Sequence, residues 1–305
     1  MVLQLGQVLR DARWNYQILE CLGKGSSTST IFKAKILPRA QIAPGQWVAI
    51  KTASEQKTFD FLKQEHKYYQ NPAIQSSSYL RTLYEGIDIH ESLTPESSYC
   101  LAFEWMDCTL EGLPSEKYGQ SCILHKNISK AVLSAIDVLN SQHLIHTVRP
   151  EDLSGITLQP QPMRAPEVWS GKGCFYSSDV WSFAVMLFDW IKPCVFGATY
   201  MPPHHWTGPW AMAKLLRLFP NSVTPHPTSH QYQAFLDIAE AIEASGRYGN
   251  TDEKCFETMS FEEELGKLSI PPSLAAFLRY LFVVDHTQRP TAAQALRSSE
   301  FQHLA

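Results

Sequence analysis

Short apolar runs separated by glycine or polar turns fill the chain from Tyr16 to Lys51. The runs are YQILECLG, TIFKAKIL and WVAIK, and they are rich in β-branched and aromatic residues, which favour strands. Because the intervening segments are polar or contain glycine, the pattern predicts a three-stranded antiparallel meander. The next segment, 57–70, distributes apolar residues between charges in a helical pattern and ends before Pro72. We therefore expect a helix directly after the third strand.

The hydrophobic pattern changes in the second half of the chain. A short apolar segment, SSYCLAFEWM, is typical of a buried strand, and a linker begins after it at Asp107. Beyond the linker, apolar periodicity predicts helices over the segments 123–144, 178–191, 232–244, 273–284 and 292–297. The Pro- and His-rich stretch 201–230 is interpreted as an irregular surface insertion.

These elements predict an α+β protein with two lobes. Residues 1–15 precede the meander and are expected to form an N-terminal extension. Residues 16–106 form the predicted small lobe, which is rich in strands and carries one helix. Residues 107–305 form the predicted large lobe, which is mainly helical.

The composition is that of an ordinary globular protein, with 44% hydrophobic and 18% charged residues in a chain of 305. The formal net charge is -4 and no basic block is present, so neither nucleic acid nor a membrane is expected as a partner. The seven cysteines form no C-x-x-C pair, which suggests neither a disulfide framework nor a zinc site and favours an intracellular protein, cytoplasmic or nuclear. No segment has the pattern of a signal peptide or a membrane span.

Candidate chemistry lies in the predicted small lobe. Gly23 and Gly25 fall in the turn between the first two strands, where missing side chains let backbone N–H groups approach a phosphate. Lys51 lies inside an apolar strand, where a buried ammonium needs an anion opposite it. Glu65, on the following helix, is the expected partner, so that Lys51 is positioned to hold phosphate oxygens. The alternatives are a glycine hairpin without a nucleotide and a snorkelling lysine beside a solvated glutamate.

The order glycine loop, V-A-I-K, helix glutamate resembles the small lobe of the eukaryotic protein kinases. The second half adds further motifs of that family. RAPE at 164–167 is similar to its A-P-E element, and DVWS at 179–182 to the start of its large central helix. DHTQRPTA at 285–292 is similar to its closing arginine element. The resemblance covers roughly residues 16 to 302 and is greatest for fungal kinases related to the SR-protein kinases.

This resemblance implies an ATP pocket. Ala49 would pack on the adenine ring, and Phe103 would close the back of the pocket. The backbone from Glu104 to Met106 would pair with the edge of the base. Phe103 and Met106 are equally compatible with a purely structural role in the core. The implied cofactors are ATP and Mg²⁺, and the implied partner is a protein, either as substrate or as binding partner.

The same resemblance implies a scaffold in the large lobe. Glu167 and Arg289 would form a buried ion pair that ties the segment after the active site to the base of this lobe. Asp179 would belong to the same scaffold. None of these residues performs chemistry in the family.

The resemblance ends in one window, 147–163, which is shortened. The family's catalytic loop reads H-R-D-x-K-x-x-N, whereas this chain reads HTVRPED at 146–152, one residue short and without the catalytic aspartate. Asp152 falls at the metal-binding asparagine, where a carboxylate can still bind a metal, and Glu151 lies beside it. No D-F-G occurs before the A-P-E element. These two acidic residues are the only candidates for the catalytic role.

Three interpretations follow from this combination of kept and lost motifs. The first is a pseudokinase, which binds ATP or acts as a non-catalytic interaction scaffold, because the transfer geometry needs the missing groups. The second is an active serine/threonine kinase that uses Asp152 or Glu151. The third is the product of an active kinase gene from which the D-F-G segment is missing. The third glycine position of the phosphate loop holds Thr28 or Ser29, which weakens phosphate closure in all three.

Overall fold

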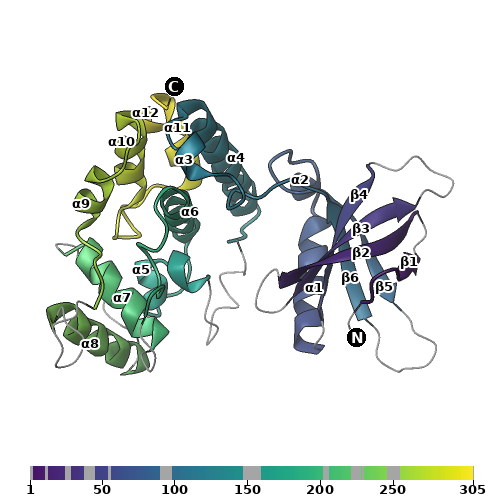
Figure 1. The fold of residues 1–305 in the computed structure, drawn as a ribbon, viewed down its shortest axis with the longest axis horizontal. Coiled ribbons are helices and arrows are strands. Elements are labelled where there is room, and N and C mark those ends of the chain that lie inside the picture. The colour runs from purple at the N-terminus through teal and green to yellow at the C-terminus, as the bar shows by residue number, and fades with distance from the viewer. Residues whose placement is uncertain are drawn as a thin grey trace. The chain divides into compact units, whose positions relative to one another are not determined.

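The computed structural model describes residues 3–10, 13–24, 29–37, 45–53, 56–89, 98–146, 159–201, 206–220, 228, 230–245 and 255–304. The chain divides into two compact units, Met1–Thr109 and Leu110–Ala305. The boundary predicted from the sequence lies slightly earlier, after Met106. The first unit contains the sheet, and the second is helical (Figure 1). The protein is therefore of the mixed α+β class.

The first unit is built on a six-stranded antiparallel sheet with the order β1-β2-β3-β4-β6-β5. Strands β2, β3 and β4 are the meander predicted from the sequence, and β6 is the predicted buried strand. Strands β1 and β5 were not predicted. The strand bounds are β1 (Val8–Arg10), β2 (Asn15–Lys24), β3 (Thr30–Leu37), β4 (Trp47–Thr52), β5 (Leu83–Ile89) and β6 (Ser98–Glu104).

The two faces of this sheet bury different apolar sets. Alternate residues of β3, namely Phe32, Ala34 and Ile36, point into one cluster that includes the buried side chains of β2 and β4, as the period-2 alternation of a strand requires. On the other face, helix α1 (Gln56–Tyr69) packs its buried apolar residues against those of β6. The short helix α2 (Pro72–Gln75) follows, capped by Asn71, whose side chain accepts from the Ala73 amide.

The second unit is a set of helices around one large aromatic and aliphatic core. All five helices predicted from the sequence are present, within a few residues of the expected bounds. They are α4 (Cys122–Ser141), α6 (Tyr176–Ile191), α8 (His230–Ser245), α10 (Pro272–Leu281) and α11 (Ala292–Arg297). The unit also contains shorter elements, namely α3 (Ser115–Tyr118), the 3₁₀ turn η2 (Gln161–Met163), α5 (Pro166–Trp169), α9 (Phe261–Gly266) and α12 (Ser299–Gln302).

The prediction of an irregular insertion over 201–230 was wrong in part, because helix α7 (Thr207–Leu218) lies inside it. This helix is buried around most of its circumference, and it was missed because it stands within a stretch rich in Pro and His. Even Lys214 is buried, and its Nζ donates to the backbone carbonyls of Cys194 at 3.0 Å and Thr199 at 3.3 Å.

The structure adds two observations about the chain as a whole. None of the seven cysteines takes part in a disulfide bond. No helix within the described ranges combines the length and the apolar character needed to cross a membrane.

Candidate functional site

The ion pair that was predicted between Lys51 and Glu65 is present in the structure. Lys51, on β4, donates from Nζ to Oε2 of Glu65, on α1, at 2.7 Å. The lysine and glutamate side chains are 25% and 29% exposed, so solvent reaches the pair and weakens its electrostatic attraction only in part. An ammonium group has three N–H donors, of which this contact uses one. The pair fixes the position of the ammonium group while leaving it accessible to an anion.

Strand register brings the other predicted pocket residues onto the face that carries Lys51. Ala49 is opposite Phe103 in the β4–β6 ladder, and Lys51 is opposite Leu101. Opposed residues of antiparallel strands project from the same face, as do alternate residues of one strand. Ala49 and Phe103 are both buried, and the ring of Tyr69 packs edge-on against Phe103 at 5.3 Å between centroids. The rings of Phe103 and Tyr69 therefore border the face of the sheet that was predicted to receive a base.

A second cation lies on this face and was not foreseen. Lys33, on β3, is opposite Ala49 in the β3–β4 ladder. Its Nζ lies 4.8 Å from the ring centroid of Trp47 and 4.5 Å from that of Trp105, distances at which an ammonium and an indole attract each other. Lys33 and Lys51 thus give this face of the sheet two positive charges, a favourable field for a phosphate chain.

Gly23 is the only one of the two predicted loop glycines that falls within the described residues. It has a φ of +105°, a conformation that side chains rarely adopt. A Cβ atom built on it would meet nothing within 4 Å, so the position is open as well as conformationally special. Gly25, like Thr28, lies outside the described residues.

The segment at the end of β6 differs in part from the expectation. Met106 is 56% exposed, so it is not a core residue, whereas Phe103 is buried. The Glu104 backbone is held by the segment before β5: its N–H donates to the Thr82 carbonyl at 2.9 Å, and its carbonyl accepts from Nε of Arg81 at 2.7 Å. Arg81 was missed because it lies outside every motif.

The predicted pair of Glu167 and Arg289 is also present, in the second unit. Both side chains are fully buried. The guanidinium group binds the carboxylate in a bidentate manner, with NH1 donating to Oε1 at 2.8 Å and NH2 to Oε2 at 2.9 Å, the geometry that suits arginine and carboxylate best. Ser178 donates a further hydrogen bond to Oε1 of Glu167 at 2.5 Å. The remaining N–H groups donate to the carbonyls of Val283, Ser177 and Val284.

Asp179 anchors the last described residue before the shortened window. Its Oδ2 accepts from the backbone N–H of His146 at 2.8 Å. Burial raises the pKa of this carboxyl group from 3.8 to about 7, although the His146 hydrogen bond lowers it. Burial is thus the main cause of the raised pKa of Asp179, because a low-dielectric environment penalises the charged form.

The segment in which the catalytic motif was expected lies largely outside the described part of the chain. This applies to Glu151 and Asp152, and to the first part of the 147–163 window. Among the residues that the structure describes, no group of three or more His, Cys, Asp or Glu side chains could hold a metal ion. The described part of the candidate site therefore consists of the residues of the first unit that were predicted to face the phosphates and the base.

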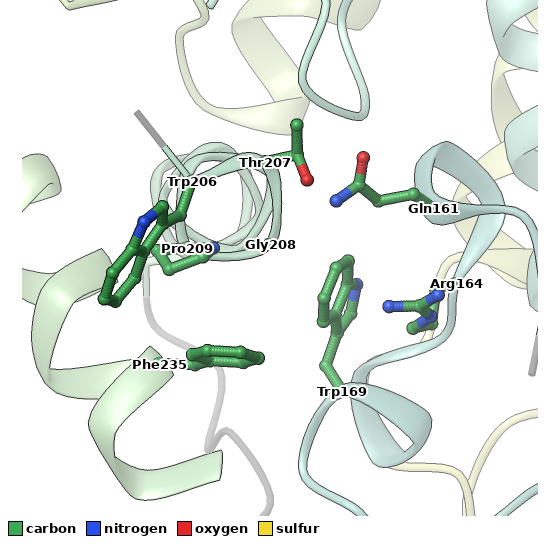
Figure 2. Close-up of a pocket in the computed structure, with 8 residues that line it drawn as sticks. All are labelled: Gln161, Arg164, Trp169, Trp206, Thr207, Gly208, Pro209 and Phe235. Carbon is green, nitrogen blue, oxygen red and sulfur yellow. The ribbon is translucent and has the colours of Figure 1, made fainter. Parts of the chain in front are cut away.

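The second unit has a pocket of its own, about 620 Å³ in volume. Figure 2 shows Trp169, Trp206 and Phe235 around this cavity, with the amide of Gln161 directed toward the hydroxyl of Thr207. Arg164 stacks on Trp169, with its guanidinium carbon 4.3 Å from the ring centroid. The pocket suits an apolar group, and none of the residues predicted to bind a nucleotide lines it. The remaining lining residues are Gly208 and Pro209.

No protein-family model matches the chain, and no curated protein matches it.

Proposed function

We propose that this chain is a protein-kinase-like domain that binds ATP through its first unit and does not transfer the phosphoryl group. The observation that carries the proposal is the ion pair of Lys51 and Glu65 at 2.7 Å on a partly open face. An ammonium held in this way is suited to phosphate oxygens, and Lys33 adds a second charge on the same face. Ala49 and Phe103 supply apolar surface for the base.

The lack of catalysis is inferred from the sequence. Phosphoryl transfer needs a group that accepts the substrate proton and carboxylates that hold Mg²⁺. The chain has no H-x-D aspartate and no D-F-G. A bound nucleotide would then act as a structural ligand, and the protein would act on another protein through its surface.

The alternatives make different predictions for Mg²⁺. An active kinase that uses Asp152 or Glu151 requires the metal for turnover, as does an active kinase whose D-F-G segment is absent from this chain. An interaction scaffold requires no nucleotide at all. The scaffold alternative is favoured by the aromatic pocket of the second unit, because Trp206 is 64% exposed at that pocket and exposed tryptophans are common anchors of protein interfaces.

The test is thermal unfolding of the full chain with ATP, with and without Mg²⁺. A ligand at one hundred times its dissociation constant stabilises the folded state by about 2.7 kcal/mol, which is easily measured as a rise in melting temperature. We expect stabilisation without Mg²⁺. The Lys51→Met variant should lose it, whereas Lys63→Met, the same change at an exposed lysine of α1, should keep it.

Other outcomes separate the alternatives. No shift at millimolar ATP would contradict nucleotide binding and leave the scaffold role. Turnover of ATP on a Ser/Arg-rich peptide, dependent on Mg²⁺, would contradict the pseudokinase proposal and favour an active kinase.

A further inference from the structure

The pocket of the second unit combines a buried tryptophan with an exposed one. Trp169, at the end of α5, is 5% exposed, whereas Trp206, directly before α7, is 64% exposed. Gly208 leaves room between the rings, since a Cβ atom built on it would lie 3.6 Å from the Trp169 ring and 3.8 Å from that of Phe235, on α8. A pocket with a buried base and an exposed rim suits a side chain that another protein presents.

Unused hydrogen-bonding groups stand beside these rings. Figure 2 shows the Gln161 amide and the Thr207 hydroxyl directed toward each other, and within the described part of the chain neither group has a hydrogen-bond partner. The N–H groups of Thr207 and Gly208 begin α7, so the helix itself offers them no acceptor, and Trp206 provides no side-chain cap. A peptide backbone at the rim would find both donors and acceptors there.

The residues that line this pocket contribute positive charge. Arg164 is the one charged side chain among the described lining residues, and the N-terminus of α7 adds the positive end of a helix dipole. The exposed carboxylates of α8 point elsewhere: Asp237 and Glu240 stand two and five positions after Phe235, and at about 100° per residue they project from the far side of the helix. The charge of the pocket is therefore complementary to an acidic partner.

A cluster of aromatic rings can also bind a cation, but the position of Arg164 argues against this. Its guanidinium carbon lies 4.3 Å from the centroid of the Trp169 ring, and Figure 2 shows it on the side of Trp169 that faces away from Phe235. A second cation would be repelled by the first. An aromatic side chain meets no such repulsion and gains edge-to-face or offset contacts with the rings.

We propose that this pocket docks a partner protein through a segment in which an aromatic residue stands among acidic residues. The aromatic side chain enters between Trp169, Trp206 and Phe235, and the acidic side chains lie toward Arg164 and the start of α7. Docking of this kind needs no nucleotide, so the inference goes beyond the proposed function.

The test is fluorescence anisotropy of the full chain with a labelled peptide, Gly-Glu-Glu-Phe-Glu-Glu-Gly. A second peptide has Leu in place of Phe, and a third has Lys in place of every Glu. Three proteins are compared: the natural chain, Trp206→Ala, and Phe61→Ala as the matched control. Phe61, on α1 in the first unit, is 56% exposed, so both variants lose an exposed aromatic side chain.

The natural chain and Phe61→Ala should bind the acidic phenylalanine peptide at least tenfold more tightly than either altered peptide. Trp206→Ala should bind it at least tenfold more weakly than the natural chain does, as truncation of an interface anchor predicts. Added salt should reduce the preference for glutamate over lysine, because it screens the charges.

The inference is overturned by any of four results: no binding of the acidic phenylalanine peptide at millimolar concentration, equal binding of the leucine peptide, a preference for the lysine peptide, or equal binding by Trp206→Ala and the natural chain. The first three are measured on the natural chain alone, so they do not depend on how a variant folds. None of the four bears on nucleotide binding, which thermal unfolding with ATP tests separately.

Discussion

The carboxyl group of Asp179 illustrates how burial sets the properties of a single residue. Its pKa rises from 3.8 to about 7 because burial penalises the charged form more than the His146 hydrogen bond favours it. The protonated form is thus preferred in the folded state. The contribution of the Asp179 carboxyl group to the free energy of unfolding is therefore greatest below about pH 4, and it is lost as the pH rises through about 7.

We therefore expect the stability of Asp179→Asn, measured relative to the natural chain, to be higher at pH 8 than at pH 5. The amide oxygen of asparagine can still accept from the His146 N–H, and it carries no charge. A difference on the order of a few kcal/mol is expected between the two pH values. Urea denaturation at a series of pH values measures it, and parallel pH profiles for the two proteins would contradict the buried-carboxyl explanation.

Arg289 differs from Asp179 because its charge is fully paired. Removing one partner of a buried pair leaves the other charge uncompensated, at a cost of about 3–5 kcal/mol. Arg289→Met should therefore destabilise the second unit strongly. The Glu167→Gln/Arg289→Met double variant should recover part of that loss, because no isolated carboxylate remains.

The control for this prediction is Arg279→Met. Arg279 also binds a carboxylate with two nitrogens, but it lies at the surface, where such pairs contribute about 0–1 kcal/mol. Equal destabilisation by the Arg289 and Arg279 variants, in urea denaturation, would show that burial of the pair is not what matters.

Whole elements were predictable from the sequence where their pattern was local. The meander of β2, β3 and β4 and the helices α4, α6, α8, α10 and α11 each carry their own periodicity. The pairs Lys51–Glu65 and Glu167–Arg289 were predictable because each partner stands in a recognisable motif. Strand β5 and helix α7 were not, since partners elsewhere in the chain determine their burial.

The contacts that were missed follow from those missing elements. Arg81 lies just before β5, and it reaches Glu104 because β5 pairs with β6. No sequence pattern near Arg81 predicts this contact. Lys33 reaches Trp47 and Trp105 because β3, β4 and β6 are adjacent in the sheet. A sequence motif identifies residues at a fixed spacing along the chain. The neighbours of Arg81 and Lys33 depend instead on how the strands pair, which only the folded sheet shows.

Helix α9 offers a test of local stabilisation at the scale of one element. It begins with a capping box, in which the Ser260 side chain accepts from the Glu263 amide and the Glu263 carboxylate accepts from the Ser260 amide. Ser260→Ala should cost about 1 kcal/mol, measured by urea denaturation. Ser299→Ala, at an exposed serine whose hydroxyl donates only to the Glu300 carboxylate among the contacts described, should cost much less; equal costs would argue against the capping role.

At the scale of the whole molecule, each unit has a hydrophobic core of its own. Two cores imply that each unit can respond separately to a mutation in its interior. Ile50 belongs to the core of the first unit and Leu281 to that of the second, and neither side chain is exposed.

We expect Ile50→Ala and Leu281→Ala each to destabilise only its own unit, by about 2–5 kcal/mol. Differential scanning calorimetry of the full chain should show two components, with one shifted by each variant. A nucleotide should shift the component that Ile50→Ala shifts. A single component that both variants move equally would contradict the independence of the two cores.

The pair of Glu167 and Arg289 has a consequence for the time course of folding. Its partners are separated by 122 positions, and bringing such distant residues together has a large entropic cost. We therefore expect the pair to form late in folding. An interaction that is absent from the transition state changes the rate of unfolding and leaves the rate of folding almost unaltered. We therefore expect the pair to slow the unfolding of the second unit, and so to lengthen the lifetime of its native state, with little effect on its rate of folding.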